Sequence, residues 1–192
     1  MKGVKRAIVL VASLNAFAAA QAADTYAIDP VHTQVLFFVN HLGYSNSQGE
    51  FLKFDGSYRF DPADWGGASV NVTIDTASLS MNDDAWDKHL KSPDFFNVEK
   101  YPQMSFRSTK VEKIGDNTGR IDGELTLLGV TKPVTLDVRF NKAAEFPMNK
   151  KFKSGFSATT TIKRSEWGLS YGVPFGIGDD VDIRLEVEGF RQ

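Results

Sequence analysis

The stretch "VDIRLEVE" (181–188), close to the C-terminus, alternates apolar and charged side chains without a break. Apolar residues occupy the odd-numbered positions and charged residues the even-numbered ones. Successive side chains of a β-strand point to opposite faces, so this period of two indicates a strand with one apolar and one polar face. The same alternation recurs at 70–75, 121–127 and 134–140, which predicts a sheet with one buried face.

Less regular apolar segments indicate four more strands, at 32–41, 50–60, 103–113 and 152–163. In the first of these, Leu36 and Phe38 break the alternation, so that both faces are apolar. The connections are typical of turns: "LGYSNSQG" (42–49), "DPADWGG" (61–67), "GDNTG" (115–119) and "LGVTKP" (128–133). Because short connections favour antiparallel neighbours, the sequence predicts an all-β fold, an extended eight-stranded antiparallel up-and-down barrel.

The interior of such a barrel is either filled by its own side chains or holds one small ligand. Strands of about ten residues, at a rise of ~3.3 Å per residue, extend for about 33 Å and would surround a long, narrow space. The 15 Phe residues of the chain supply apolar surface without a polar atom. An elongated apolar ligand suits this interior, although periodicity does not distinguish a cavity from a packed core.

The first 22 residues differ from the rest of the chain. A basic start is followed by an apolar run at 7–14 and by Ala20-Gln21-Ala22, an A-x-A cleavage pattern. This combination predicts a secretory signal peptide that is cleaved after Ala22, which leaves 23–192 as a single exported domain. A membrane anchor is disfavoured because a spanning helix needs about 20 apolar residues.

Charge and cysteine content exclude several classes of function. The first 22 residues carry three basic and no acidic side chains, which leaves 19 basic and 24 acidic residues in 23–192, a net charge of −5. An acidic domain is a poor match for nucleic acid or for a generally basic lipid-binding surface. The chain has no Cys, so disulfides and thiol catalysis are excluded.

The most charged stretch, "NDDAWDKHLKSPDFF" (82–96), is explained by a short helix between strands. We expect Asn82 to cap this helix and Pro93 to end it. Asp87 and Lys91 are spaced four residues apart, as in a helix-stabilising ion pair. The Phe95-Phe96 pair that follows forms an apolar hook suited to plugging a barrel mouth.

An enzyme that acts on a bound lipid through Asp87 and His89 is an alternative interpretation of the same stretch. The sequence lacks a nucleophile elbow and an H-E-x-x-H pattern, however, so we expect no catalytic residue. His32 and His41 are nine residues apart on one expected strand, which puts them on opposite faces. The sequence therefore predicts no metal site and no required cofactor.

Five stretches in order resemble the YceI family of polyisoprenoid-binding proteins. They are "YAIDPVHTQVLFFVNHLGYSNSQGEF" (26–51), "FDGSYRFDP" (54–62), "DKHLKSPDFFNVEKYPQMSF" (87–106), "GELTLLGVTKPVTLDV" (123–138) and "GFSATTTIKRSEWGL" (155–169). The resemblance implies a lipocalin-like barrel with a helix between strands and an apolar tunnel. It also implies a periplasmic, non-enzymatic role and a bound isoprenoid lipid, such as an isoprenoid quinone of the ubiquinone type or a polyprenyl phosphate.

The resemblance places Val35, Phe37 and Val39 on the inner face of the first long strand, with His41 beyond them. It matches Asp87, His89, Leu90, Phe95 and Phe96 to a helix-and-hook motif. This chain has Trp86 and Ser80-Met81 where many members have Arg and Asp-Thr, which makes the expected mouth more apolar. The candidate ligand-binding residues are Val35, Phe37, Val39, His41, Phe51, Phe54, Val72, Ile74, Met104, Phe106, Leu125, Leu127, Phe156 and Trp167.

The leading interpretation is a periplasmic carrier that binds an isoprenoid lipid without stable membrane insertion. The sequence leaves the oligomeric state open, and a homodimer is compatible with it. One alternative is a small outer-membrane β-barrel, which also has eight alternating strands behind a signal peptide but carries its apolar faces outward. The direction of the apolar faces separates these two possibilities.

Overall fold

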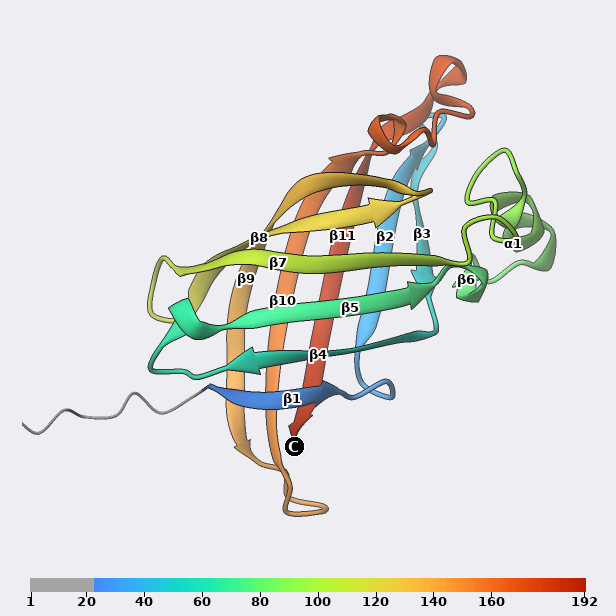
Figure 1. The fold of residues 1–192 in the computed structure, drawn as a ribbon. Helices are drawn as coiled ribbons and strands as arrows, with labels where there is room; N and C mark the ends of the chain where they lie inside the picture. The colour runs from blue at the N-terminus through green and yellow to red at the C-terminus, as the bar shows by residue number, and fades with distance from the viewer. Residues whose placement is uncertain (1–22) are drawn as a thin grey trace, which may run out of the picture.

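A single antiparallel sheet that closes on itself forms most of the structure, a computed structural model that describes residues 23–192 (Figure 1). The predicted signal peptide lies outside the described residues. Within them, no helix is long and apolar enough to cross a membrane. The elements are β1 (Asp24–Ile28), β2 (Gln34–His41), β3 (Ser45–Phe51), β4 (Phe54–Phe60), η1 (Trp65–Gly67), β5 (Ser69–Asp75), η2 (Thr76–Ser78), β6 (Leu79–Ser80), α1 (Asp84–Lys91), β7 (Gln103–Lys113), β8 (Thr118–Leu127), β9 (Val130–Glu145), β10 (Phe152–Lys163), η3 (Arg164–Trp167), η4 (Val173–Phe175) and β11 (Ile177–Arg191).

Three of the barrel strands are interrupted, so eleven strand segments make an eight-stranded ring. β1 and β2 follow one another along the same edge of β11. β4 and β3 pair with β1 and β2 in turn, and β5 and β6 pair with β4 and β3. The remaining strands β7 to β11 pair consecutively, and β11 returns to β1. The predicted eight-stranded antiparallel barrel, with a short helix between strands, is therefore confirmed.

Several strand boundaries differ from the prediction. The segment Ser45–Gly49 was expected to be a connection, but it belongs to β3 and pairs residue by residue with β2. β1 was not expected as a strand. In "LGVTKP" only Leu128 and Gly129 form the turn, both with positive φ as a two-residue hairpin requires. In Ser45–Gly49, long-range backbone pairing overrides weak local strand preference.

The two faces of the sheet differ in polarity as the alternation predicts. Val181, Ile183 and Leu185 of β11 point into the barrel, where they line its interior. Arg184, between them, is exposed and pairs with Glu186 on the outer face. Apolar side chains therefore face inward, the reverse of the arrangement that an outer-membrane barrel requires.

A cluster of charged side chains around the buried Lys153 and Asp29 holds the connection between β1 and β2 against β11. The Nζ of Lys153, on β10, lies 2.9 Å from the Oδ2 of Asp29 and also pairs with Glu188. His32 Nδ1 lies 2.7 Å from the same Asp29 oxygen. The rings of Phe146 and Phe190 each lie 4.7 Å from the Lys153 ammonium, at cation–π distance. The sequence did not predict this cluster, because its members come from four separate parts of the chain.

Asp29 provides a test of how strongly this cluster holds the barrel closed. Burial opposes ionisation, but hydrogen bonds from Lys153 and His32 lower the pKa of Asp29 to about 2. Its unfolded-state pKa is about 4, so the ionised carboxylate stabilises the fold above pH ~4, and this contribution is lost as the pH falls towards 2. We expect Asp29→Asn to lower the free energy of unfolding at pH 7 by about 2 kcal/mol, as measured by urea unfolding.

The matched control is Asp24→Asn, which removes an exposed ion pair with Arg191 at the same edge of the barrel. We expect this control to cost less than about 1 kcal/mol. Asp29→Asn should also flatten the loss of stability between pH 4 and pH 2. An unchanged acid limb in this variant would contradict the assignment.

Candidate functional site: a cavity inside the barrel

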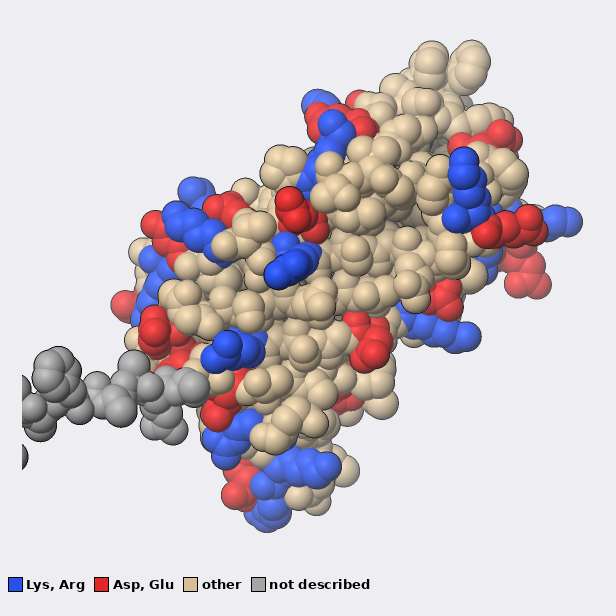
Figure 2. Space-filling view, viewed as in Figure 1, with Lys and Arg blue, Asp and Glu red and all other residues tan. Residues whose placement is uncertain are grey.

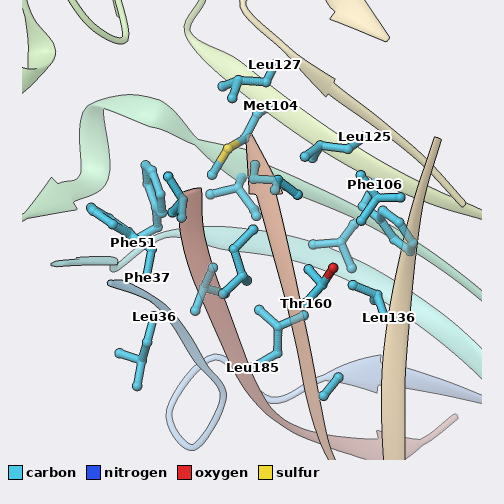
Figure 3. A pocket seen from close by; sticks show the side chains of 18 of the residues that line it. Leu36, Phe37, Phe51, Met104, Phe106, Leu125, Leu127, Leu136, Thr160 and Leu185 are labelled. Atoms are coloured by element: carbon cyan, nitrogen blue, oxygen red, sulfur yellow. The ribbon is translucent and has the colours of Figure 1, made fainter. Parts of the chain in front are cut away.

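The barrel encloses an apolar cavity of about 540 Å³. In Figure 3 the side chains of Phe37, Phe51, Met104, Phe106 and Leu136, which come from four different strands, surround one space. This volume lies within the range of roughly 300–1,000 Å³ that is usual for ligand pockets. The barrel therefore contains a cavity rather than a fully packed core, the question that the periodicity left open.

The structure brings all but one of the candidate residues to the cavity wall. Those that line it are Val35, Phe37, Val39, His41, Phe51, Phe54, Val72, Ile74, Met104, Phe106, Leu125, Leu127 and Phe156. Trp167 does not line the cavity. It is buried in η3, and its Nε1 donates a hydrogen bond to the Leu125 carbonyl at 3.1 Å. A buried indole N–H needs a hydrogen-bond acceptor, and Trp167 finds one in the barrel wall, so it stabilises the wall and does not face the cavity.

Glycines on the strands give two of the wall rings the room that they occupy. A β-carbon on Gly49 would lie 2.2 Å from the Phe37 ring and 2.5 Å from the Met81 sulfur. A β-carbon on Gly123 would lie 2.3 Å from the Phe106 ring. Each ring occupies the space next to a glycine on a nearby strand. Sequence analysis missed this because it depends on which residues face one another across strands.

The helix α1 and its hook cover one end of the cavity. Asp83, and not Asn82, caps α1: its Oδ1 accepts a hydrogen bond from the Trp86 amide at 2.9 Å. The Asn82 cap prediction is therefore wrong. Asn82 has a φ of 60°, a left-handed conformation that Asn tolerates better than most residues. The spacing predicted for Asp87 and Lys91 is observed as an ion pair of 3.8 Å.

His89 belongs to an aromatic cluster that joins α1 to the connection between β10 and β11. Its ring lies 5.0 Å from Phe95 and 5.5 Å from Tyr171, centroid to centroid. Asp87 accepts a hydrogen bond from the Met81 amide at 2.5 Å. These contacts hold the helix in place over the cavity end. Tyr171 both lines the cavity and is 46% exposed, so the cavity approaches the surface beside it.

The apolar departures from the family pattern also face the cavity. Met81 and Trp86 both line it, and the Trp86 ring lies 5.7 Å from His41 at the end of β2. His41 is therefore close to the helix-covered end, as a candidate contact for a polar group would need to be. Aromatic and aliphatic side chains therefore line this end of the cavity.

Arg164 is a buried charge in the cavity wall that sequence analysis missed. Its guanidinium donates hydrogen bonds to the carbonyls of Gly178 at 2.7 Å, Leu169 at 2.7 Å and Ile177 at 3.4 Å. Burial lowers the pKa of Arg164, although nearby Asp179 opposes this effect. The guanidinium thus braces the β10–β11 connection. The sequence did contain a signal for this inward position. Arg164 directly follows β10, and continuing the alternation of that strand puts it on the same face as Thr160 and Ile162.

Gly49 tests whether the wall depends on the absence of a side chain. We expect Gly49→Ala to lower the free energy of unfolding by about 1–3 kcal/mol, because its β-carbon must displace Phe37 or Met81. The measurement is urea unfolding. Gly155→Ala is the control, since the nearest atom to its β-carbon would be 3.7 Å away. Equal stability of the two variants would contradict this account of the wall.

A closed eight-stranded antiparallel barrel around an apolar cavity defines a class of protein whose interior has room for one small ligand. Residues 26–189 match the YceI-like domain, and the chain belongs to the YceI family. Protein YceI of Escherichia coli is 42% identical over 183 residues, which is 94% of each chain.

Two solved structures share the fold. The crystal structure of a Campylobacter jejuni YceI protein is 35% identical, with a TM-score of 0.71, and the match covers 80% of this chain and 90% of that one. A polyisoprenoid binding domain from Saccharophagus degradans has a TM-score of 0.69 at 12% identity, over 87% of this chain and 98% of that one. At such low identity this second likeness establishes the shared fold alone.

Proposed function

We propose that the protein is a periplasmic carrier that holds one long isoprenoid lipid, an isoprenoid quinone or a polyprenyl phosphate, in the barrel cavity. The observation that carries this proposal is the apolar cavity of about 540 Å³. A hydrocarbon chain gains roughly 25 cal/mol for each Å² of apolar surface that leaves water, before the costs of association. The fold shared with a domain described as polyisoprenoid-binding supports the class of ligand.

The polar end of the ligand would remain at the covered end of the cavity. Arg164 carries a buried charge, but its hydrogen bonds go to backbone carbonyls. A charged headgroup placed deep in the barrel would lose its hydration without a matching partner, which costs several kcal/mol. His41 and His89 offer ring nitrogens near the mouth, where an uncharged quinone oxygen or a solvated phosphate could be met.

Binding, rather than catalysis, is the activity that we propose. The enzyme alternative uses Asp87 and His89, but both residues make the contacts that hold α1 over the cavity. A carrier needs no reacting group, because its work is to keep an insoluble chain out of water.

Export of the protein is part of the proposal and has its own test. We expect a signal peptidase to remove residues 1–22, so that N-terminal sequencing of the protein recovered from the periplasm should begin at Ala23. Recovery of a chain that starts at Met1 from that fraction would contradict the assignment.

Phe37 tests whether the cavity is the binding site. Phe37 lines the cavity, and a carboxylate there would have to be desolvated against hydrocarbon. We therefore expect Phe37→Asp to remove most of the isoprenoid that copurifies with the parent protein, and to cost some stability. The measurement is the molar ratio of lipid to protein, by mass spectrometry of organic extracts.

Phe38→Asp is the matched control, because it makes the same change at the next residue, which does not line the cavity. Arg184→Ser is a second control on the outer face. Both controls should retain the lipid. Absence of lipid from the parent, together with failure to bind added ubiquinone, would sink the carrier proposal. Lipid lost from the controls but kept by Phe37→Asp would mean that the ligand lies outside the barrel.

A further inference from the structure

One end of the barrel carries a group of exposed apolar side chains. Leu42 and Tyr44 lie in the turn between β2 and β3, and Tyr171 and Phe175 lie in the connection between β10 and β11. The two connections are neighbours, because Ile177 pairs with His41 and the Leu42 side chain lies next to Gly176. Tyr44 is 85% exposed and Phe175 is 81% exposed. We call these four side chains, Leu42, Tyr44, Tyr171 and Phe175, the apolar tip.

The apolar tip is also free of charge. No Lys, Arg, Asp or Glu occurs in 33–49 or in 167–178, although these residues make up 24% of the chain. In Figure 2 the uppermost part of the molecule, where Figure 1 places the β10–β11 connection, is tan without blue or red. Lys163 and Asp180, at the base of this connection, are paired with one another at 2.7 Å.

The apolar tip is continuous with the cavity. Tyr171 belongs to both, and Ile177 and His41 line the cavity directly beneath the two connections. The opposite end of the barrel, at the turn between β9 and β10, has a different character. There Glu145 pairs with Lys150, so that end presents charge to the solvent.

We propose that the apolar tip docks reversibly on the surface of a lipid bilayer and sets the cavity mouth against the acyl chains. This inference rests on the proposed carrier function. Tyr, Phe and Leu side chains partition favourably into the boundary between headgroups and acyl chains. A long isoprenoid resides in that hydrocarbon, and a mouth pressed against it lets the chain enter the barrel without crossing water.

The chemistry of the tip specifies what kind of bilayer contact this is. With no charge on the tip and a net charge of −5 over 23–192, the contact does not depend on anionic lipids or on low salt. Four side chains bury little area, which makes the contact weak and brief, as delivery and collection of a ligand require.

The test combines vesicle binding with ligand uptake. Protein would be sedimented with phosphatidylcholine vesicles, with and without added phosphatidylglycerol, at low and high salt. The rate of ubiquinone transfer from the vesicles would then be compared with equilibrium uptake of ubiquinone added without vesicles. The tip variant is Tyr44→Ser with Phe175→Ser, two residues that do not line the cavity. The matched control is Val31→Ser with Met148→Ser, which removes side chains that are 80% and 86% exposed outside the tip.

We expect the parent and the control to bind all vesicles equally, and the tip variant to lose binding and transfer rate by about tenfold. Its uptake without vesicles should be unchanged. The docking proposal is overturned if the parent does not sediment, if the control loses as much as the tip variant, or if binding requires phosphatidylglycerol and disappears in salt. It is also overturned if sedimentation velocity shows a dimer of the parent that does not bind vesicles and that the tip variant no longer forms.

The two proposals fail separately. A parent protein that takes up ubiquinone but never sediments with vesicles retains the carrier function and loses the docking surface. A parent that sediments through its tip but takes up no isoprenoid retains the docking surface and loses the carrier function.

Discussion

The pairing of the first strand with the last is the constraint on which the rest of the barrel depends. A sheet that closes on itself has no free edge, and every residue along its strands is committed either to the lumen or to the solvent. Here the closing strand is made of two pieces, β1 and β2, which both lie along β11. The cluster around Lys153 holds the break between them, so one buried ammonium group links both pieces to the strand that they must meet.

Closure explains why so much of the architecture could be predicted from the sequence. In a ring of strands, alternation decides which side chains face inward, and it placed Leu125 and Leu127 correctly on the cavity wall, whereas Phe37, on a strand with two apolar faces, was placed by the family resemblance. The polar segment Ser45–Gly49 was missed because its strand conformation comes from pairing with β2 and not from its own residues. Trp167 was misplaced for a related reason: it lies in a short helix, where the period of two no longer applies.

The cavity was implied by the family resemblance and could not be predicted from periodicity, because periodicity specifies direction and not distance. Whether inward side chains meet at the centre depends on strand number, on tilt and on how each ring lies against its neighbours. The buried Arg164 shows the same limit. Arg164 directly follows β10 and keeps the inward side of its alternation, but its three carbonyl partners are Leu169 in the β10–β11 connection and Ile177 and Gly178 at the start of β11, which no local pattern brings together. The position of a charged residue in an apolar wall is therefore explained only by the hydrogen-bond acceptors that surround it in the folded structure.

The glycines beside Phe37 and Phe106 have a consequence for how barrels of this kind diversify. Gly49 is an ordinary member of the hydrogen-bonded ladder, and a β-carbon there would meet only side chains, so a change leaves the backbone pairing intact. Gly123 differs, because it lies beside a bulge and its β-carbon would also lie 2.7 Å from the Arg107 carbonyl oxygen. What changes at Gly49 is the width of the cavity, because the Phe37 ring or the Met81 side chain must leave the space that the new β-carbon takes. The width of the cavity beside Phe37 thus depends on a residue that has no side chain. A different width can therefore arise through a substitution at Gly49 without replacing any aromatic side chain.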